Sequence, residues 1–468
     1  MRALMVQGAS SSAGKSLLVT ALARAFRRRG IDVVPFKAQN MSNNARVVHG
    51  GEIGTAQYLQ ALAAGVKPDV RMNPVLVKPE GDNRSQVIVL GQPDLELSRL
   101  AWRDRCEALW PVIAESLRSL QAEHELVLLE GAGSPAEINL RDSDLANMRS
   151  AEAADAAVVL VCDIDRGGAF AHLYGTWALL GEHERARLSG FVLNKFRGDE
   201  RLLAPAPERL EELTGVQTLG VLPWLKHGLP DEDGAAQPIH IPGRPRVAVV
   251  RYPTASNLDE FKPLEQVAAL AWVTSASELA DAELLVLPGS KHVAADVAWL
   301  RRSGIADAIG ARIRPGGRVL AICGGLQMLG EQLVDEAGID GSAPGIAILP
   351  LTTRFHGDKT TRRTISRFAE LPEPWSARSG LVFEGYEIRH GESVPTRALS
   401  EALPGGLGYV SGSVLGIYLH GLFEHPPLIE ALLGARASSD LEQTFDELAD
   451  VIEARLDIGA LLESVTVV

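Results

Sequence analysis

The chain has 468 residues, which predicts two to four domains at about 100–200 residues each. Its net charge of −13 argues against sequence-independent binding to nucleic acid, and no apolar run approaches the roughly 18 residues of a membrane span. Cys106, Cys162 and Cys323 are odd in number and far apart, which argues against a disulfide framework and predicts a cytoplasmic protein.

The first predicted element is a short strand over residues 3–7, which leads into the glycine-rich stretch GASSSAGKS. A glycine-rich loop that runs into a helix points its backbone N–H groups inward and binds phosphates. Five residues separate Gly8 from Gly14, one more than in the standard pattern. We expect Lys15 to reach the β- and γ-phosphates of a nucleotide and Ser16 to ligate Mg²⁺.

A helix follows, with an apolar face formed by Leu18, Ala21, Leu22, Ala25 and Phe26. It ends in Arg27–Arg29 and Gly30, because cations favour the C-terminal end of a helix dipole and glycine commonly ends a helix. The arginine run is therefore expected to be a solvated helix end and not a nucleic-acid site.

The second strand is predicted over residues 31–36, and Lys37 follows it directly. Because ligands of open α/β sheets bind beyond the carboxyl ends of the strands, Lys37 is expected to face the nucleotide. A surface lysine is the alternative on position alone. The amide-rich residues 39–44 are candidates to bind a substrate with many carboxylates and amides.

Three further apolar segments predict strands with helical segments between them: residues 126–129, 158–162 and 191–193. This alternation predicts βαβ units and a parallel sheet. Glu130 follows the first segment and is expected to be the second Mg²⁺ contact. Asp163 follows the next segment and is a candidate for a metal or substrate-carboxylate contact. Asn194 follows the last segment, either to bind the adenine edge or as a simple turn residue.

We place domain boundaries by composition, since residues 237–245 are rich in proline and glycine and separate two strand-rich regions. Residues 1–236 are predicted to form an ATP-dependent domain, and residues 246–435 a second α/β domain. Residues 436–468 are expected to be C-terminal helices whose apolar spacing serves packing.

The second domain is organised around a predicted strand over residues 319–322 that ends at Cys323. The two glycines that follow permit a sharp turn into a helix, which exposes a nucleophile above the sheet edge. The backbone N–H of Gly324 would face an oxyanion formed at Cys323, and the turn at Gly289 offers a second donor. A buried structural cysteine beside a glycine turn is the alternative.

A second candidate catalytic residue lies far downstream, where residues 416–420 are predicted to form a strand that ends in His420. A general base must lie within hydrogen-bond reach of its thiol, and only the fold can bring Cys323 and His420 together.

This half resembles a class I glutamine amidotransferase domain in the stretches AICGGLQMLG, LPGSK and YLHGLF. The resemblance implies that Cys323 attacks the side-chain amide of glutamine, that His420 is the acid/base, and that ammonia is released. Many relatives carry a glutamate two residues after the histidine, where this chain has Leu422. The third member of the triad is therefore absent or supplied elsewhere, with Glu387 and Glu424 the nearby carboxylates in the sequence.

The N-terminal half resembles the dethiobiotin synthetase-like ATPases. More closely, the chain resembles the cobyric acid synthase family in PFKAQNMSNNA, GEIGTAQ, EGAGSPAEINLRDSDLANM and LNKFRGD. The resemblance covers nearly the whole chain. It implies an α/β protein with two parallel-sheet domains, an N-terminal P-loop domain and a C-terminal flavodoxin-like class I glutamine amidotransferase domain.

Together the two halves predict amide formation from a carboxylate with ATP and glutamine-derived ammonia. Hydroxide is a poor leaving group, and transfer of the γ-phosphoryl group to the carboxylate gives an acyl phosphate that ammonia can attack. Lys15, Lys37 and Mg²⁺ are expected to hold the phosphates, with Ser16 and Glu130 around the metal. The resemblance implies a corrinoid polycarboxylate, adenosylcobyrinic acid a,c-diamide, amidated at its b, d, e and g carboxylates in cobalamin biosynthesis.

Two alternatives stay open at this point. One is cobyrinic acid a,c-diamide synthase, the sister enzyme, although PFKAQNMSNNA and SPAEINLRDSD favour the b, d, e, g enzyme. The other is a ParA-like ATPase switch, which has no need of a glutaminase half. The sequence also allows a homo-oligomer.

Overall fold

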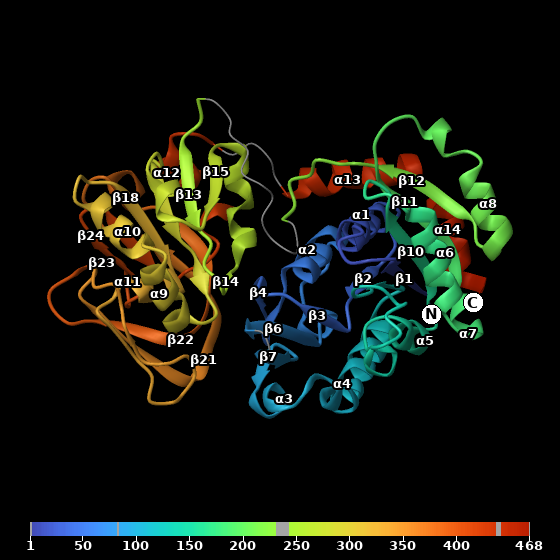
Figure 1. Cartoon of the computed structure of the whole chain (residues 1–468), viewed down its shortest axis with the longest axis horizontal. Helices are drawn as coiled ribbons and strands as arrows, with labels where there is room; N and C mark the ends of the chain where they lie inside the picture. The colour runs from blue at the N-terminus through green and yellow to red at the C-terminus, as the bar shows by residue number, and fades with distance from the viewer. Residues whose placement is uncertain (1, 82–83, 231–242, 437–440, 468) are drawn as a thin grey trace.

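The structure contains two α/β lobes that lie side by side (Figure 1). It is a computed structural model and describes residues 2–81, 84–230, 243–436 and 441–467. Each lobe is built on a sheet whose central strands are parallel, which confirms the predicted fold class. Of the predicted linker, residues 237–245, the first six lie outside the described residues.

The N-terminal lobe is built on a six-stranded sheet of order β12-β11-β10-β1-β9-β2, in which all neighbours are parallel. Its strands are β1 (Arg2–Gly8), β2 (Val33–Phe36), β9 (Leu126–Glu130), β10 (Ala157–Asp163), β11 (Leu188–Phe196) and β12 (Thr218–Pro223). Since parallel strands end at one edge, Gly8, Glu130, Asp163 and Asn194 lie along the same edge of the sheet.

Helices cover both faces of this sheet, because successive residues of β1 point to opposite sides. Leu4 and Val6 pack in one core and Ala3 and Met5 in the other. The helices of the lobe are α1 (Lys15–Arg28), α2 (Thr55–Ala64), α3 (Leu95–Arg99), α4 (Trp102–Glu123), α5 (Met148–Ala154), α6 (Ala169–Leu179), α7 (Glu182–Arg185) and α8 (Ala206–Thr214).

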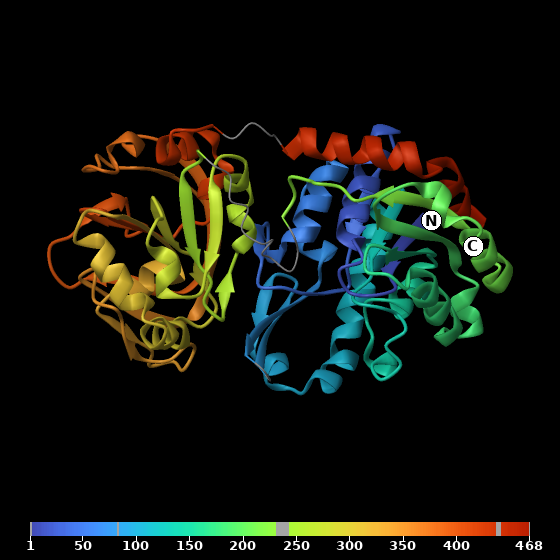
Figure 2. The same cartoon turned by 45° about the horizontal axis from the view of Figure 1, so that its top comes forward.

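The two C-terminal helices, α13 (Leu441–Arg455) and α14 (Ile458–Val467), return to the N-terminal lobe and pack on it (Figures 1 and 2). Phe445 and Ile452 are buried in the same core as Leu22 and Phe26 of α1. This confirms the prediction that the C-terminal apolar spacing serves packing. The N-terminal lobe is thus completed by the last part of the chain.

The arginine run at the end of α1 is exposed, as predicted, and two of its members also form ion pairs with α13. Arg28 lies 2.7 Å from Asp450, and Arg29 pairs with Glu453, both on α13. One turn earlier, Arg24 pairs with Asp446 at 2.7 Å. Local sequence could not show this, because the acidic partners follow more than 400 residues later in the chain.

We expect the Phe445→Ala variant to lose about 3–5 kcal/mol of unfolding free energy, because the ring is fully buried and its loss leaves a cavity. Denaturant unfolding followed in the N-terminal lobe measures the change. The exposed Gln443→Ala variant on the same helix is the matched control and should unfold like the parent chain. Equal stability of the two variants would contradict the docking of α13.

The C-terminal lobe is built on a seven-stranded sheet of order β15-β13-β16-β18-β25-β24-β23. The first five are parallel, and β24 and β23 are antiparallel additions. Its strands are β13 (Arg246–Val250), β15 (Ala269–Val273), β16 (Leu284–Leu287), β18 (Arg318–Ile322), β23 (Ser400–Leu403), β24 (Gly408–Ser411) and β25 (Val414–Ile417). Its helices are α9 (Val293–Arg302), α10 (Ile305–Ile313), α11 (Gly324–Leu329) and α12 (Pro426–Leu433).

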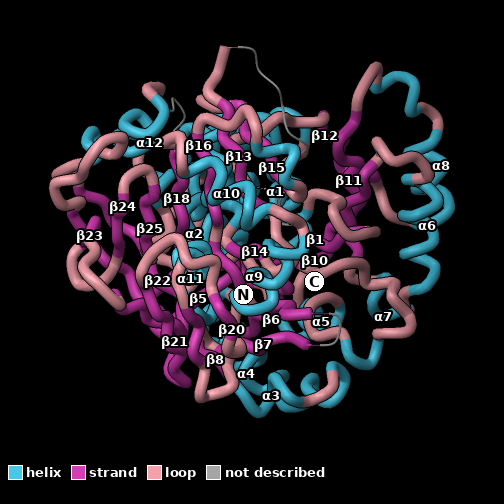
Figure 3. Tube along the Cα trace, turned by 60° about the vertical axis from the view of Figure 1, so that its left-hand side comes forward, coloured by secondary structure: helices cyan, strands magenta, loops and turns pink. Residues whose placement is uncertain are grey.

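Each lobe also carries smaller sheets, whose strands are among those drawn in magenta in Figure 3, and some of these strands contact each other across the interface. Those of the N-terminal lobe comprise β3 (Gln39–Met41), β4 (Ala45–Val48), β5 (Gly51–Gly54), β6 (Val75–Gly81), β7 (Arg84–Val89) and β8 (Gln92–Asp94). Those of the C-terminal lobe comprise β14 (Ala255–Ser256), β17 (Gly289–Ser290), β19 (Gln332–Val334), β20 (Ala343–Pro344), β21 (Leu351–Arg367) and β22 (Val382–Pro395). Ile388 of β22 packs against Ala45, Leu76 and Ile88 across the interface. No helix within the described ranges is long and apolar enough to cross a membrane.

Candidate active sites

The first candidate site lies at the carboxyl edge of the N-terminal sheet and centres on Glu130. Ser16 Oγ donates to Glu130 Oε1 at 2.8 Å, and Lys37 Nζ donates to the same oxygen at 2.8 Å. Gln60 donates to the other carboxylate oxygen. Glu130 and Lys37 are buried. The structure therefore brings together three of the residues predicted for the nucleotide site.

The glycine-rich loop closes over this edge. Lys15 Nζ donates to the backbone carbonyls of Ser10, at 3.3 Å, and Gly133, at 3.1 Å. Gly14 has a left-handed backbone with φ of 97°, and a Cβ there would lie 2.1 Å from the amide nitrogen of Asn194. Glycine is therefore required at this position by conformation and by space.

Asn194 holds the loop, because its amide nitrogen donates to the carbonyl of Ala13 at 2.8 Å and its oxygen accepts from the N–H of Lys195. Asp163 lies on the neighbouring strand and pairs with Lys195 at 3.0 Å and with Arg166 at 3.4 Å. The contacts of Asp163 do not join it to Glu130. Its role as a metal contact stays a prediction, as does the adenine contact of Asn194.

The fit of Mg²⁺ rests on Ser16 and Glu130. A hydroxyl and a carboxylate oxygen are the donors that Mg²⁺ takes from proteins, and nucleotide phosphates commonly supply further ligands. The two side chains already lie within hydrogen-bond distance of one another. Within the described residues, no three His, Cys, Asp or Glu side chains are grouped to hold a metal by themselves.

The second candidate site centres on Cys323, at the turn between β18 and α11. Its backbone has φ 49° and ψ −107°, a conformation that costs energy for any residue except glycine. The turn is held by hydrogen bonds from Cys323 N to Ile417 O, at 2.7 Å, and from Gly325 N to Pro288 O, at 3.0 Å. Such a strained turn at a strand end is typical of a nucleophile raised above the sheet.

His420 lies beside Cys323 in the fold, although 97 residues separate them in the sequence. The prediction that its strand continues to His420 is wrong, because β25 ends at Ile417. The chain then leaves the sheet and pairs with β22, where the backbones of His420 and Tyr386 exchange hydrogen bonds of 2.9 and 3.2 Å. The Tyr386 ring stacks on the imidazole at a centroid distance of 5.3 Å.

Glu260 supplies the carboxylate that orients His420. Its Oε1 lies 2.9 Å from His420 Nδ1, and its Oε2 accepts the backbone N–H of Gly421 at 3.0 Å. It lies in the 3₁₀ helix η4 (Leu258–Gln266) and is fully buried. The two carboxylates near His420 in the sequence serve elsewhere, since Glu387 pairs with Arg362 and Arg389, and Glu424 pairs with an arginine of the other lobe.

Electrostatics favour the protonated form of His420. Burial alone would lower the pKa of the imidazole, but the charge of Glu260 and the side-chain hydrogen bonds to Cys323 and Glu260 raise this pKa to about 10. An imidazolium held between a carboxylate and a thiol is the arrangement that makes a thiolate available for nucleophilic attack.

Two glycine turns lie against this pair. A Cβ at Gly289 would lie 2.9 Å from the His420 ring, and a Cβ at Gly324 would lie 2.6 Å from the backbone nitrogen of Ser290. The structure thus brings Gly289 and Gly324 together around Cys323, as predicted from their turns. Their role as oxyanion donors stays a prediction.

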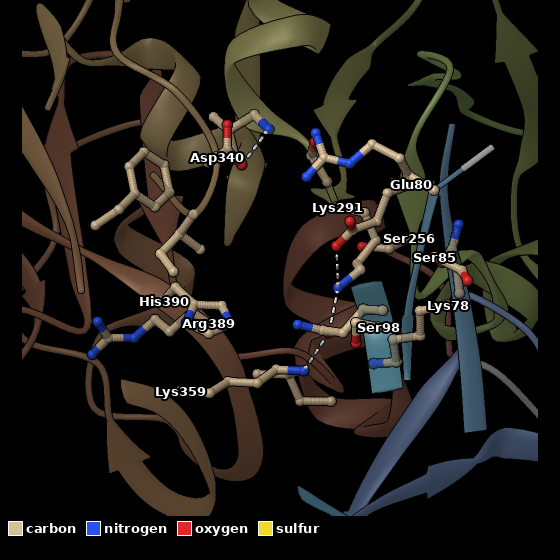
Figure 4. Close-up of a pocket in the computed structure, with 18 of the residues that line it drawn as sticks. Lys78, Glu80, Ser85, Ser98, Ser256, Lys291, Asp340, Lys359, Arg389 and His390 are labelled. Atoms are coloured by element: carbon tan, nitrogen blue, oxygen red, sulfur yellow. Dashed lines mark hydrogen bonds and ion pairs between the residues drawn. The ribbon is translucent and has the colours of Figure 1, made fainter. Parts of the chain in front are cut away.

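Cys323 and His420 open into a cavity of about 590 Å³ that both lobes line. Figure 4 shows Lys291 and Lys359 of the C-terminal lobe facing Lys78 and Glu80 of β6. Lys291 Nζ donates to Gln86 Oε1 at 2.7 Å, whereas Lys78 and Lys359 both pair with the buried Glu52.

This lysine cluster (Lys78, Lys291 and Lys359) places three amines against two carboxylates, those of Glu52 and Glu80. Burial, together with the charges of Lys359 and Lys78, lowers the pKa of Lys291 to about 7. Burial likewise lowers the pKa of Lys78 to about 8. A carboxylate that entered the cavity would relieve this repulsion, so the cavity suits an anionic ligand group.

Comparison with known proteins identifies the domain in each lobe. Residues 4–230 match the family model of the CobQ/CobB/MinD/ParA nucleotide binding domain, and residues 246–428 match that of the CobB/CobQ-like glutamine amidotransferase domain. The chain is 55% identical to the cobyric acid synthase of Variovorax paradoxus, with 98% of each chain covered. It is 53% identical to that of a Polaromonas species, with 98% of this chain and 97% of the relative covered. The chain belongs to the cobyric acid synthase family.

Family membership confirms the resemblance predicted from the sequence and makes the chain a glutamine-dependent amidotransferase with a nucleotide-binding domain. The main residue that sequence reasoning missed is Glu260. Within NLDEFKPL it stands beside a second acid, Asp259, and no spacing to Cys323 or His420 marks it. In this cobyric acid synthase family member, only the fold selects Glu260 from the carboxylates of the C-terminal lobe.

Proposed function

We propose that this chain is a cobyric acid synthase of cobalamin biosynthesis, which amidates the b, d, e and g carboxylates of adenosylcobyrinic acid a,c-diamide with ATP and glutamine. The observation that carries the proposal is that one chain holds both a Cys323–His420–Glu260 centre and a glycine-rich loop, and matches cobyric acid synthase relatives over 97% or more of both chains.

In the glutaminase half, Cys323 attacks the side-chain amide carbon of glutamine. With Nδ1 engaged by Glu260, Nε2 of His420 is the nitrogen left to take the thiol proton and to return it to the leaving ammonia. Backbone N–H groups at Gly324 and Gly289 stabilise the oxyanion. Water then hydrolyses the thioester.

In the synthetase half, the phosphate loop and Lys15 hold the nucleotide phosphates, while Lys37 and Ser16 flank Glu130 at the γ-phosphate end. Mg²⁺ bound there neutralises charge on the phosphates. Lys37 stabilises the γ-phosphoryl group as it passes to the substrate carboxylate and ADP leaves. Ammonia then attacks the acyl phosphate, which forms the amide and releases inorganic phosphate.

The proposal is tested by incubating the chain with ATP, Mg²⁺, glutamine and adenosylcobyrinic acid a,c-diamide and following the corrinoid by mass. Four successive carboxyl-to-amide changes are expected. Amidation of cobyrinic acid alone would indicate the sister enzyme instead. Glutamine hydrolysis with neither corrinoid altered would overturn the corrin assignment. A ParA-like switch does not account for the amidotransferase domain.

The Glu260→Gln variant is expected to hydrolyse glutamine about 10²-fold more slowly, since the backbone N–H of Gly421 and the Tyr386 ring still hold the imidazole. Loss of the carboxylate charge lowers the pKa of His420. The imidazolium is then lost at lower pH, so the alkaline limb of the kcat/KM profile moves to lower pH. The Glu384→Gln variant, which alters an exposed carboxylate, is the control and should keep the original profile.

The Lys291→Met variant is expected to raise KM for glutamine by about tenfold or more, because the α-carboxylate loses a charged hydrogen-bond donor. Amidation driven by free ammonia should be unchanged. Steady-state kinetics with each nitrogen donor measure both effects, with the exposed Lys226→Met variant as the control. An unchanged KM would show that the lysine cluster does not bind the carboxylate.

A further inference from the structure

Arg46 is a buried residue of the N-terminal lobe that extends into the C-terminal lobe. It lies on β4, nine residues after Lys37 of the nucleotide site. Its guanidinium pairs with Asp259 at 2.6 Å and with Glu424 at 2.8 Å, and it donates to the hydroxyl of Tyr386 at 2.5 Å.

Each of these three partners either contacts His420 or lies close to a residue that does. Asp259 directly precedes Glu260, and the Tyr386 ring stacks on the imidazole. Glu424 lies in the 3₁₀ helix η7 (Leu422–Glu424). This helix begins directly after Gly421, whose N–H donates to Glu260. Arg46 therefore ties together three separate segments of the C-terminal lobe at the back of the glutaminase centre.

The backbone on either side of Arg46 is tied to the same region. Asn44 Oδ1 accepts the N–H of Leu258 at 3.0 Å, and the N–H of Ala45 donates to Asn257 Oδ1 at 3.2 Å. These bonds fix the start of η4, the segment that carries Glu260. The position of Glu260 thus depends on contacts with the other lobe.

The acidic residues around Arg46 also indicate that it stabilises this region. Asp259, Glu260 and Glu424 lie within one patch, and the first two are buried. Burial raises the pKa of Asp259, and Arg46 acts against that shift. Without the guanidinium, the buried carboxylate of Asp259 would lose its ion-pair partner beside Glu260, which strongly favours rearrangement or protonation.

We propose that Arg46 is a positioning residue of the glutaminase reaction, through which the nucleotide-binding lobe holds Glu260 and Tyr386 in place around His420. The inference rests on the proposed glutaminase roles of Cys323 and His420. It means that the glutaminase centre is complete only when the two lobes are docked.

The test compares Arg46→Met, Arg46→Lys and a matched control, Arg363→Met. Arg363 reaches across the same interface to the Tyr58 hydroxyl, at 3.5 Å, and pairs with Glu384 of its own lobe at 2.7 Å. Neither Glu260 nor His420 is among these partners. Three readouts are measured: kcat and KM for glutamine hydrolysis, ATP-dependent amidation with free ammonia, and the pH dependence of Cys323 alkylation by iodoacetamide. Cys323 lines the cavity, whereas burial raises the pKa of the Cys106 thiol and raises that of the Cys162 thiol to about 11, so these two thiols react more slowly with the reagent.

Arg46→Met should lower kcat for glutamine by at least about tenfold, with KM and the ammonia-driven reaction kept within about threefold. The alkylation midpoint should move to higher pH, because loss of the guanidinium leaves the negative groups around the pair uncompensated. The charged and titratable groups that face His420 or Arg46 are Asp259, Glu260, Tyr386 and Glu424. Further groups that interact with Cys323 are Lys78, Arg389, Tyr252 and Tyr418, and none of these four is altered in the variants. Arg46→Lys should recover part of both effects, and Arg363→Met should match the parent enzyme.

Three results would overturn the inference: equal losses with glutamine and ammonia, an unmoved alkylation midpoint, or Arg46→Lys no better than Arg46→Met. If Arg46→Met does not fold, Asp259→Asn tests the same network from the C-terminal lobe and should give a smaller loss confined to glutamine. If the unmodified enzyme hydrolyses no glutamine, the proposed function itself fails.

Discussion

The Cys323→Ser variant is expected to lose glutamine hydrolysis by at least about 10⁴-fold, since a serine hydroxyl at this turn has neither the acidity nor the nucleophilicity of the thiol. Amidation with free ammonia should persist, because the nucleotide site lies in the other lobe and shares no residue with the Cys323 turn. Glutaminase and ammonia-dependent assays on the same preparation measure the two activities.

The control for this variant is Cys106→Ser, which alters another buried cysteine, on α4 of the N-terminal lobe. It should leave glutamine hydrolysis close to that of the parent enzyme. Retention of glutaminase activity in Cys323→Ser would show that Cys323 is not the nucleophile.

The Lys15→Met variant is expected to lose ATP-dependent amidation and to keep glutamine hydrolysis. It should lower ATP-dependent amidation by at least about 10³-fold with either nitrogen donor, because the loop loses the cation that stabilises charge on the transferring phosphoryl group. Glutamine hydrolysis should persist, since Lys15 lies at the carboxyl edge of the N-terminal sheet, away from Cys323.

The exposed Lys67→Met variant in the same lobe controls for loss of charge and should retain amidation. Equal inhibition of glutaminase and amidation by Lys15→Met would mean that the nucleotide site governs the glutaminase centre directly. Unchanged amidation would contradict the assignment of the phosphate loop.

The two lobes are joined by more than the chain between them. Glu52 of β5 pairs with Lys78 of its own lobe and with Lys359 of β21, and Arg46 crosses the same interface close to His420. Residues of both lobes therefore line the cavity beside Cys323. In the proposed reaction, ammonia leaves Cys323 at a point where the two lobes meet.

Much of the architecture could be predicted from the sequence because its signals are local. Apolar runs of four to seven residues with helical spacers specify parallel strands, and a glycine-rich loop before GKS specifies a phosphate site. Cys323 and His420 could be identified for the same reason, since each stands at the end of an apolar run beside a glycine. These features depend on backbone conformation within a few residues.

Tertiary structure alone decided the long-range pairings, because these depend on which distant segments of the chain meet. Glu260 is 160 residues from His420, and Arg46 is more than 200 residues from Asp259, so neither pairing leaves a spacing in the sequence. The docking of α13 on α1 joins residues more than 400 positions apart. The sequence by itself determined the two folds, the glycine-rich loop and the turn at Cys323. The orientation of the base and the sharing of the glutamine cavity follow only from how the lobes pack, since burial and charge pairing arise when the chain is folded.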